Sequence, residues 1–554
     1  MPETLTKPYL KNVALIEPQN GIYTGFQGLV RTEPLGLEYI AGAICSLDTN
    51  QPRVVEEVTI FDDRLAPGEW REKMRQNPPD MIGIRLSYTA DVPIVHKLVR
   101  DIREEVGSDI PVVIGGHHIS LRPSDAFIDG VNAVVIGPGE VPMRDLVKAW
   151  AKDHSFESVR NIWYQNGEGE WQSNLSPVKV VSSYEFNSCQ MDQRPLPRRD
   201  LVAKYRKMGE GYYFLNYPNV ATMEMGRGCR FRCSFCSVIK FHHGRYEVES
   251  PNRTVSEILA LPDDIKYVNF IDDLAFNSGI QWNPATGRRE LFDPGMELAD
   301  ELIRLGMEDR IRFWAQVRTS DIYPIKVSER TRAREKFHKL AKVGLDMMLN
   351  GLESLNSVND LKRINKGSNL ATNIEAIRIE HEEGIRCWGA QIVFPDWTEE
   401  DYKRVAEINN VLKIAAPQFT ILTELPGSDD YEEALKERKL ITLNPANFDF
   451  FHWVTQTRLP IEETYRLIAE VLYQGTGSSF TSLDRFRADL KDGRTTMAAT
   501  KVARAKFEAM RNPQTHIANI RQIDNAQEEY WQRFIMKQAA RYGGPETALL
   551  EKAS

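Results

Sequence analysis

The first part of the chain alternates short apolar runs with stretches in which apolar residues recur at helical spacing. The runs that predict strands are Asn12–Ile16, Val54–Phe61, Met81–Ile84, Val112–Ile114 and Ala133–Ile136. Between them, helical spacing predicts helices around Leu37–Ile44 and over Ile94–Val106. Strands that are apolar along their whole length imply a parallel sheet covered by helices on both faces. We therefore predict an α/β chain that begins with a doubly wound domain over residues 1–150.

The same alternation returns after residue 220 and predicts six strands in β/α order over residues 221–430, an order that suits a partial (β/α)6 barrel. The six expected strands lie at 223–225, 267–271, 311–317, 347–351, 388–393 and 418–423, with helical patterns between them. In such barrels the residues at the carboxyl ends of the strands face the site. By this rule the candidate site residues are Asp272, Asp273, Arg318, Glu353, Ser354, Gln391, Thr423 and Glu424.

Glycines and small polar residues occupy the carboxyl ends of the N-terminal strands. Ligands of doubly wound sheets bind at this edge, and glycine lets the backbone approach a ligand closely. The candidate binding residues are Ser87 and Thr89 after one strand, Gly115, Gly116 and His117 after the next, and Gly137 and Glu140 after the last. Tight turns with nothing bound would use the same residue types.

Three of the six cysteines, Cys229, Cys233 and Cys236, lie within eight residues at a CxxxCxxC spacing. Three thiolates on one short loop can bind three irons of a cubane iron–sulfur cluster and leave the fourth iron open to substrate chemistry. A structural zinc site is the competing interpretation, and its fourth ligand would have to be His242 or His243. Three buried thiols without a metal are the remaining alternative.

The cysteine segment, with Gly226 and Gly228 before it and Phe235 inside it, resembles the cluster motif of the radical S-adenosylmethionine (radical SAM) superfamily. The resemblance implies a 4Fe–4S cluster held by the three cysteines, with SAM chelated by the open iron. The segment 351–367 is similar to a Gly-hydrophobic-Glu-Ser…Lys-x-x-x-Lys-Gly segment of the same family. That similarity implies that Glu353 and Ser354 help to hold SAM, and we add Arg318 and Gln391 as cofactor-binding candidates.

The doubly wound domain precedes this motif. In that position it resembles the cobalamin-binding domain of the cobalamin-dependent radical SAM enzymes. Gly115-Gly-His117 matches a Gly-Gly-His signature of that family, whereas Gly137-Pro-Gly-Glu140 departs from its Gly-Glu-Gly-Glu signature. The Asp-x-His-x-x-Gly motif that supplies an axial histidine in other cobalamin proteins is absent. The resemblance therefore implies cobalamin bound without a histidine from that motif, and a vestigial domain that has lost the cofactor is the alternative.

Composition excludes several classes of function. A net charge of -8 argues against a nucleic-acid surface, which needs a basic face. The chain has no apolar run long enough to span a membrane and no signal-like segment at its start, so we expect a cytoplasmic protein. Six cysteines in 554 residues do not make a disulfide framework. We expect Cys45, Cys189 and Cys387 to be ordinary thiols, with Cys387 as the candidate for an extra role in radical chemistry.

Residues 151–220 are rich in turn formers and are predicted to be a linker, and residues 431–554 to be a helical C-terminal region. Around Phe448–Trp453 this region loosely resembles the subgroup that contains the hopanoid methylases and the anaerobic magnesium-protoporphyrin ester cyclase. Its last part is amphipathic, with Arg485, Arg487, Lys501, Arg504 and Lys506 beside Trp531, Phe534 and Ile535. These helices would either cap the barrel or make a peripheral membrane contact.

These features favour a cobalamin-dependent radical SAM methyltransferase that acts on an unactivated carbon, or a phosphorus, of a small-molecule or lipid-like substrate. In that family a deoxyadenosyl radical abstracts hydrogen and cobalamin delivers a methyl group from SAM. Electrons would come from a donor such as flavodoxin or ferredoxin, and we expect no nucleic-acid partner. A radical oxidative cyclase is the alternative enzyme. A cobalamin-responsive sensor is a third, non-catalytic alternative, but such a protein would have no need of a cluster with an open iron. We assign no catalytic residue from the sequence.

Overall fold

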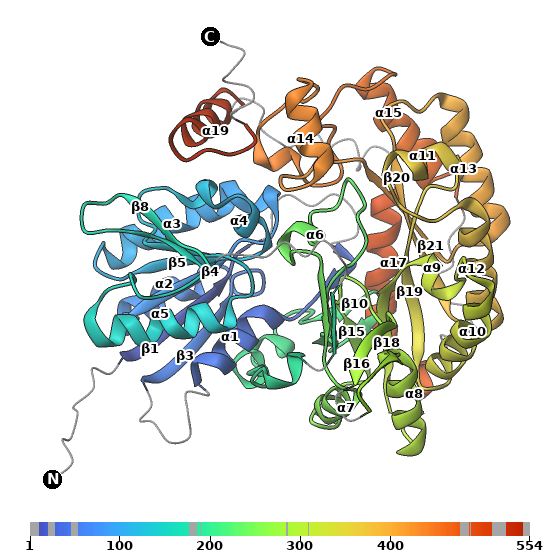
Figure 1. Ribbon diagram of the computed structural model, residues 1–554, viewed down its shortest axis with the longest axis horizontal. Helices are drawn as coiled ribbons and strands as arrows, with labels where there is room; N and C mark the ends of the chain where they lie inside the picture. Colours follow the sequence, from blue (N-terminus) through green and yellow to red (C-terminus); the bar gives the residue numbers. More distant parts are fainter. Residues whose placement is uncertain are drawn as a thin grey trace.

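The computed structural model describes residues 10–19, 28–45, 54–176, 185–188, 190–283, 286–308, 310–476, 487, 489–511 and 528–546. Cys189 and Arg485, which the sequence analysis named, lie outside these residues. Figure 1 shows an N-terminal sheet domain beside a larger half-barrel, with C-terminal helices next to both.

The N-terminal domain is built on a seven-stranded sheet in the order β3-β1-β4-β5-β6-β7-β8, in which the first five are parallel. These strands are β1 (Leu10–Glu17), β3 (Val55–Asp62), β4 (Met81–Arg85), β5 (Val112–Gly115), β6 (Ala133–Val135), β7 (Ile162–Gln165) and β8 (Trp171–Asn174). Helices α1 (Leu35–Cys45) and α5 (Glu140–Asp153) cover one face, and α2 (Glu69–Gln76) and α3 (Val92–Val106) cover the other. The predicted doubly wound fold is confirmed.

The segment predicted to be a linker contributes to this sheet. β7 pairs antiparallel with β6, and β8 pairs antiparallel with β7. Along β7 the buried residues Ile162 and Tyr164 alternate with partly exposed ones, which is the pattern of a strand with one covered face. The sheet therefore extends to Asn174, well beyond the expected boundary at residue 150.

The half-barrel is a six-stranded parallel sheet in the order β12-β15-β18-β19-β20-β21, as the β/α alternation predicted. Its strands are β12 (Ala221–Met223), β15 (Tyr267–Phe270), β18 (Arg312–Val317), β19 (Leu345–Glu353), β20 (Arg386–Val393) and β21 (Ala416–Ile421). Its helices are α7 (Pro251–Leu259), α8 (Pro294–Arg304), α9 (Thr319–Ile322), α10 (Val327–Lys342), α11 (Val358–Arg363), α12 (Leu370–Glu382) and α13 (Glu399–Leu412). Figure 1 shows α8, α10, α12 and α13 along the outer side of this sheet.

A hairpin of β10 (Tyr213–Phe214) and β11 (Tyr217–Pro218), to which β2 (Val30–Arg31) also pairs, closes the amino end of the half-barrel. The ring of Tyr217 stacks on Tyr267 with centroids 4.1 Å apart, and the Tyr267 hydroxyl donates to Asp346 at 3.0 Å. These residues lie at the amino ends of the barrel strands, so the carboxyl end is the side from which a ligand can enter.

Small additional sheets frame the cysteine segment. β13 (Gly226–Gly228), β14 (Arg245–Val248) and β9 (Glu185–Ser188) form one of them, and β16 (Gly279–Asn283) and β17 (Arg288–Phe292) form a hairpin after β15. Helix α4 (His117–Leu121) of the N-terminal domain contacts helix α6 (Val238–Phe241), which follows the last cysteine. Figure 1 places α6 between the two domains.

The C-terminal region is helical, as predicted, and contains α14 (Asp429–Lys436), α15 (Ile461–Leu467), α17 (Met497–Arg511) and α19 (Glu528–Tyr542). Helix α19 does not cap the barrel, and it lies beside the N-terminal domain (Figure 1). Its Trp531 packs on His96 of α3 at 5.4 Å between centroids, and Trp531 and Ile535 are 2% and 1% exposed. The apolar face of α19 is thus covered by protein and is not available to a membrane. A membrane contact through the other C-terminal helices stays a prediction.

Within the residues that the structure describes, no helix combines the length and the apolar composition needed to cross a membrane.

We predict that Trp531→Ala will destabilise the protein by about 3–5 kcal/mol, because it removes a buried indole and leaves a cavity against α3. Tyr530→Ala is the matched control, since the Tyr530 side chain is exposed on the same helix, and it should change stability by less than about 0.5 kcal/mol. Chemical denaturation followed by circular dichroism measures both variants. Equal effects would mean that α19 is not an integral part of the N-terminal domain.

Candidate active site

The cluster loop, which we define as residues 226–237, is held in place at its start by two neighbouring carboxylates. Asp272 accepts hydrogen bonds from the backbone N–H groups of Met225 and Gly226. Asp273 accepts from the Gly228 N–H at 3.0 Å, and the His242 ring lies 3.3 Å from its carboxylate. Asp272 is fully buried and structural, whereas the Asp273 side chain is 31% exposed. Only Asp273 is therefore accessible to a ligand.

The three thiols of the loop are partly or fully buried. Burial raises the pKa of the Cys229 thiol to about 11 and that of Cys236 to about 12, so a metal that binds them would have to displace their protons. Cys233 lies 3.4 Å from a guanidinium nitrogen of Arg318. Around no point in the described ranges do three or more His, Cys, Asp or Glu side chains converge to hold one ion. In a cubane cluster each iron takes its own thiolate, so such convergence is not required.

Arg318, Glu353 and Lys366 meet next to the cluster loop, at the carboxyl ends of the barrel strands. The Arg318 guanidinium lies 3.7 Å from the centre of the Phe231 ring and donates to the Lys366 carbonyl oxygen. The Lys366 ammonium group donates to the Glu353 carboxylate at 2.6 Å, and both side chains are buried. A β-carbon at Gly351 would lie 2.5 Å from that ammonium nitrogen, so glycine there makes room for the pair.

Ser354, another predicted site residue, has structural partners. The hydroxyl of Ser354 donates to Asp360 at 2.7 Å and accepts from the Asn356 N–H at 3.0 Å, so it stabilises the turn after β19. A role of Ser354 in binding SAM stays a prediction.

The expectation that Gln391 faces the barrel interior is wrong. Its amide exchanges hydrogen bonds of 2.7 and 3.2 Å with Asn409 of α13, in the helix layer. Cys387 lies on the same face of β20, fully buried beside Asn350. Successive strand residues point to opposite faces of the sheet. Cys387 and Gln391 are four positions apart, so both side chains point outward, to the helix layer. Cys387 is thus remote from the interior, and an extra role for it in radical chemistry has no support.

The glycine edge, which we define as the loops at 86–89, 115–120 and 137–140, combines the candidate residues of the N-terminal domain. The Leu86 N–H donates to the Gly115 carbonyl at 2.7 Å, and the Gly137 N–H donates to the Ser120 hydroxyl at 2.9 Å. A β-carbon on Gly116 would lie 2.5 Å from the Leu86 carbonyl oxygen and 2.8 Å from the Ser87 hydroxyl. Glycine at 116 is therefore required by the neighbouring loop itself.

Gly137 is different, because a β-carbon there would meet no atom within 4 Å, and its φ is +78°. It offers exposed backbone with open space above it. Ser87 and Gly115 lie on the same edge, and Tyr88 between the loops is 51% exposed. An edge with bare backbone fits a large flat ligand such as a corrin ring, so the residues present are compatible with cobalamin.

Thr89 is buried at one end of a chain of hydrogen bonds that no sequence pattern predicted. Its hydroxyl lies 3.0 Å from His118 Nδ1, and His118 Nε2 lies 3.0 Å from the Asp125 carboxylate. The carboxylate accepts a hydrogen bond from Nε2–H, which leaves Nδ1 to accept one from the Thr89 hydroxyl. Only the Gly-Gly-His-His sequence hinted at a second important histidine.

The glycine edge and the cluster loop are in direct contact. His117 Nε2 lies 2.9 Å from the Ser237 hydroxyl, and its ring stacks on Phe241 with centroids 4.5 Å apart. Glu140 pairs with Arg227 at 2.6 Å, and Arg227 also binds Glu224 at 2.7 Å. Burial alone would raise the pKa of Glu140, but Arg227 outweighs it and the pKa lies below its usual range. Glu140 therefore joins the domains, contrary to its expected role on the ligand.

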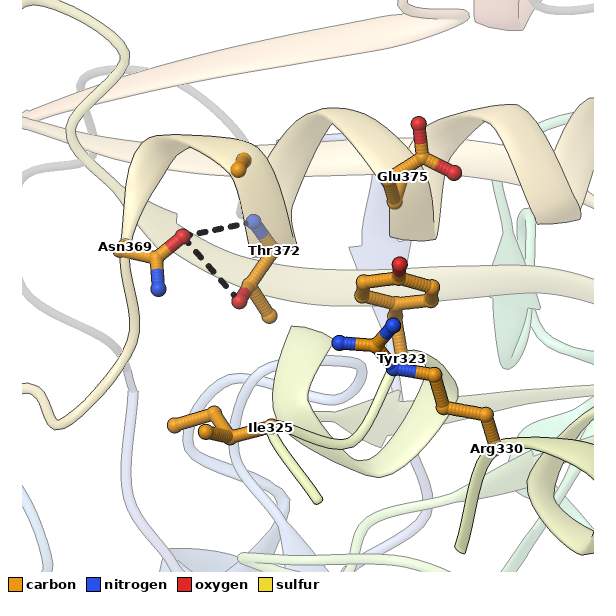
Figure 2. A pocket seen from close by; sticks show the side chains of 7 residues that line it. Tyr323, Ile325, Arg330, Asn369, Thr372 and Glu375 are labelled. Carbon is orange, nitrogen blue, oxygen red and sulfur yellow. Dashed lines mark hydrogen bonds between the residues drawn. The ribbon is translucent and has the colours of Figure 1, made fainter. Parts of the chain in front are cut away.

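A hollow of about 430 Å³ lies apart from these loops, among the helices at the start of α12. Figure 2 shows Arg330 over the Tyr323 ring on one side, and Asn369 accepting two hydrogen bonds from Thr372 on the other. None of the predicted site residues lines it.

Comparison with known proteins identifies two domains. Residues 29–147 match the family model "B12 binding domain", and residues 223–408 match "Radical SAM superfamily". The hopanoid C-3 methylase of Methylococcus capsulatus is 25% identical over 92% of this chain and 89% of its own length. The anaerobic magnesium-protoporphyrin IX monomethyl ester cyclase of Cereibacter sphaeroides is 25% identical over 64% of this chain and 52% of its own length.

Among solved structures, the cobalamin-dependent SAM radical enzyme OxsB, with aqua-cobalamin and SAM bound, superposes with a TM-score of 0.63 at 15% identity. The match covers 98% of this chain and 79% of that one. At this identity the likeness demonstrates a shared fold, in which an N-terminal sheet domain precedes a radical SAM barrel.

We predict that Gly137→Leu will lower cobalamin retention at least about tenfold, because the side chain would fill the space above the bare backbone. Gly169→Leu is the matched control, since Gly169 has φ +77° and equally open surroundings but lies in the β7–β8 turn. Both variants carry the same left-handed strain of about 1–2 kcal/mol. Cobalamin per chain after gel filtration is the measurement, and equal retention in the two variants would contradict a corrin at this edge.

We predict that Glu140→Gln will cost about 3 kcal/mol of stability, because it leaves Arg227, whose side chain is only 15% exposed, with one of its two carboxylates missing. Glu399→Gln, which removes an exposed pair with Lys403 at 2.9 Å, should cost less than about 1 kcal/mol. Denaturant unfolding and protease sensitivity between the domains report the difference. If the two substitutions lower the stability by equally small amounts, Glu140 does not hold the two domains together.

Proposed function

This chain is a cobalamin-dependent radical SAM enzyme, and we propose that it transfers a methyl group from SAM to an unactivated carbon or phosphorus. The observation that carries the proposal is the direct contact between the glycine edge and the cluster loop. A reaction that needs both cofactors at one substrate requires their loops to face each other. The likeness to a hopanoid methylase over almost the whole of both chains supports methyl transfer.

Each part of the site has a proposed task. Cys229, Cys233 and Cys236 would hold the 4Fe–4S cluster, and the glycine edge would hold cobalamin. When bound, these groups supply a radical that removes hydrogen from the substrate and a methyl group that replaces it. The accessible carboxylate of Asp273 is the better candidate for the ammonium group of SAM, because Lys366 already neutralises Glu353. Arg318 would contribute positive charge beside Cys233.

The substrate is proposed to be a small molecule or a lipid-like compound that enters from the carboxyl end of the half-barrel. Reduction of the cluster calls for an electron donor of the flavodoxin or ferredoxin class. We place the enzyme in the cytoplasm, because cluster thiolates persist in a reducing compartment.

We predict that anaerobic turnover with methyl-deuterated SAM will give a product carrying the labelled methyl group. Methyl transfer uses two SAM molecules with different fates, so S-adenosylhomocysteine and deoxyadenosine should form in about equal amounts. Mass spectrometry of the product and liquid chromatography of the two nucleosides are the measurements.

A variant with Cys229, Cys233 and Cys236 replaced by Ala should lose its iron and form neither nucleoside. An unlabelled product that forms with deoxyadenosine but without S-adenosylhomocysteine would overturn methyl transfer and favour a radical cyclase. That alternative is supported by the partial match to the ester cyclase.

A further inference from the structure

His117 links the N-terminal domain to the segment that follows the last cluster cysteine. Its hydrogen-bond partner Ser237 directly follows Cys236, and its stacking partner Phe241 ends α6. The two rings are 27° from parallel. One side chain therefore fixes both ends of α6 relative to the glycine edge.

The backbone on both sides of His117 packs against the loop after β4. A β-carbon at Gly116 would lie 2.5 Å from the Leu86 carbonyl oxygen, so the chain passes close to the loop after β4. The His118 N–H donates to the Ser87 carbonyl at 3.2 Å. Both neighbours of His117 in the chain therefore contact the loop after β4. Through His117, the cluster loop is connected to the edge at which cobalamin is proposed to bind.

The contact does not depend on charge. Burial lowers the pKa of His117 to about 4, and the nearby Asp273 carboxylate only partly opposes this effect. The ring is neutral around pH 7, so its bond to Ser237 is an ordinary directional hydrogen bond.

We propose that His117 is a positioning residue that sets the separation of the cluster loop from the glycine edge and thereby couples hydrogen abstraction to methyl transfer. The proposal rests on the proposed function. A substrate radical made at one cofactor must be within reach of the methyl group at the other. A misplacement of about 1 Å can cost about a hundredfold in rate.

Two substitutions test the contact from opposite domains. His117→Phe keeps an aromatic ring for stacking on Phe241 but removes the hydrogen bond, and Ser237→Ala removes the same hydrogen bond from the cluster side. We expect each variant to form about tenfold less methylated product per deoxyadenosine. The double variant should be no worse than either single variant, because both remove one interaction. His338→Phe, at an exposed histidine, is the control.

A second measurement does not depend on turnover. Pulsed EPR on protein with a reduced cluster and cob(II)alamin gives the distance distribution between the two paramagnets. We expect a narrow distribution in the parent protein and a broader one in both variants.

An unchanged product ratio with an unchanged distribution would overturn the positioning role. So would a His117→Phe protein that loses cobalamin while Ser237→Ala is normal, because His117 would then act on the cofactor alone. If the parent protein gives no methylated product, the proposed function fails, whereas the distance measurement still decides the role of His117.

Discussion

The arrangement of this protein depends on one constraint, which is that two loops from separate domains must stay in contact. The glycine edge is built from turns after β4, β5 and β6, and the cluster loop follows β12. A neutral hydrogen bond with a ring stack and a buried ion pair join them. The hydrogen bond between His117 and Ser237 fixes the relative orientation of the two loops, and the ion pair between Glu140 and Arg227 strengthens their association.

The buried charges around the interface occur in connected sets, because an isolated buried charge would be costly. Arg227 lies between Glu140 and Glu224, and Arg194 binds Glu224 from the other side at 2.6 Å. A second set starts from Asp125, which pairs with Arg122 at 3.1 Å. Arg122 in turn contacts Tyr431 of α14 and Glu546 after α19. The end of the described chain thus links the first domain to α14.

Much of the fold could be predicted from the sequence. Fully apolar strands alternating with helical spacing are compatible with few structures other than parallel sheets covered on both faces, and both large sheets follow that pattern. The three cysteines were equally clear, because their spacing alone restricts them to one short loop. The strand-end rule located Arg318 and Glu353 correctly, since all parallel strands end at the same edge. It could not find His118 or Lys366, whose importance comes from partners rather than from a pattern.

The sequence by itself determined which residue types lie at which strand ends, because periodicity and spacing are local properties. Only the tertiary structure decided which partner each side chain has. Gln391 faces α13 because a single step along a strand reverses the face. Glu353 is neutralised by Lys366 because the turn after β19 returns the chain to the same point. Glu140 binds Arg227 rather than a ligand because two domains meet there. Such pairings depend on contacts between distant segments, and no local pattern in the chain records them.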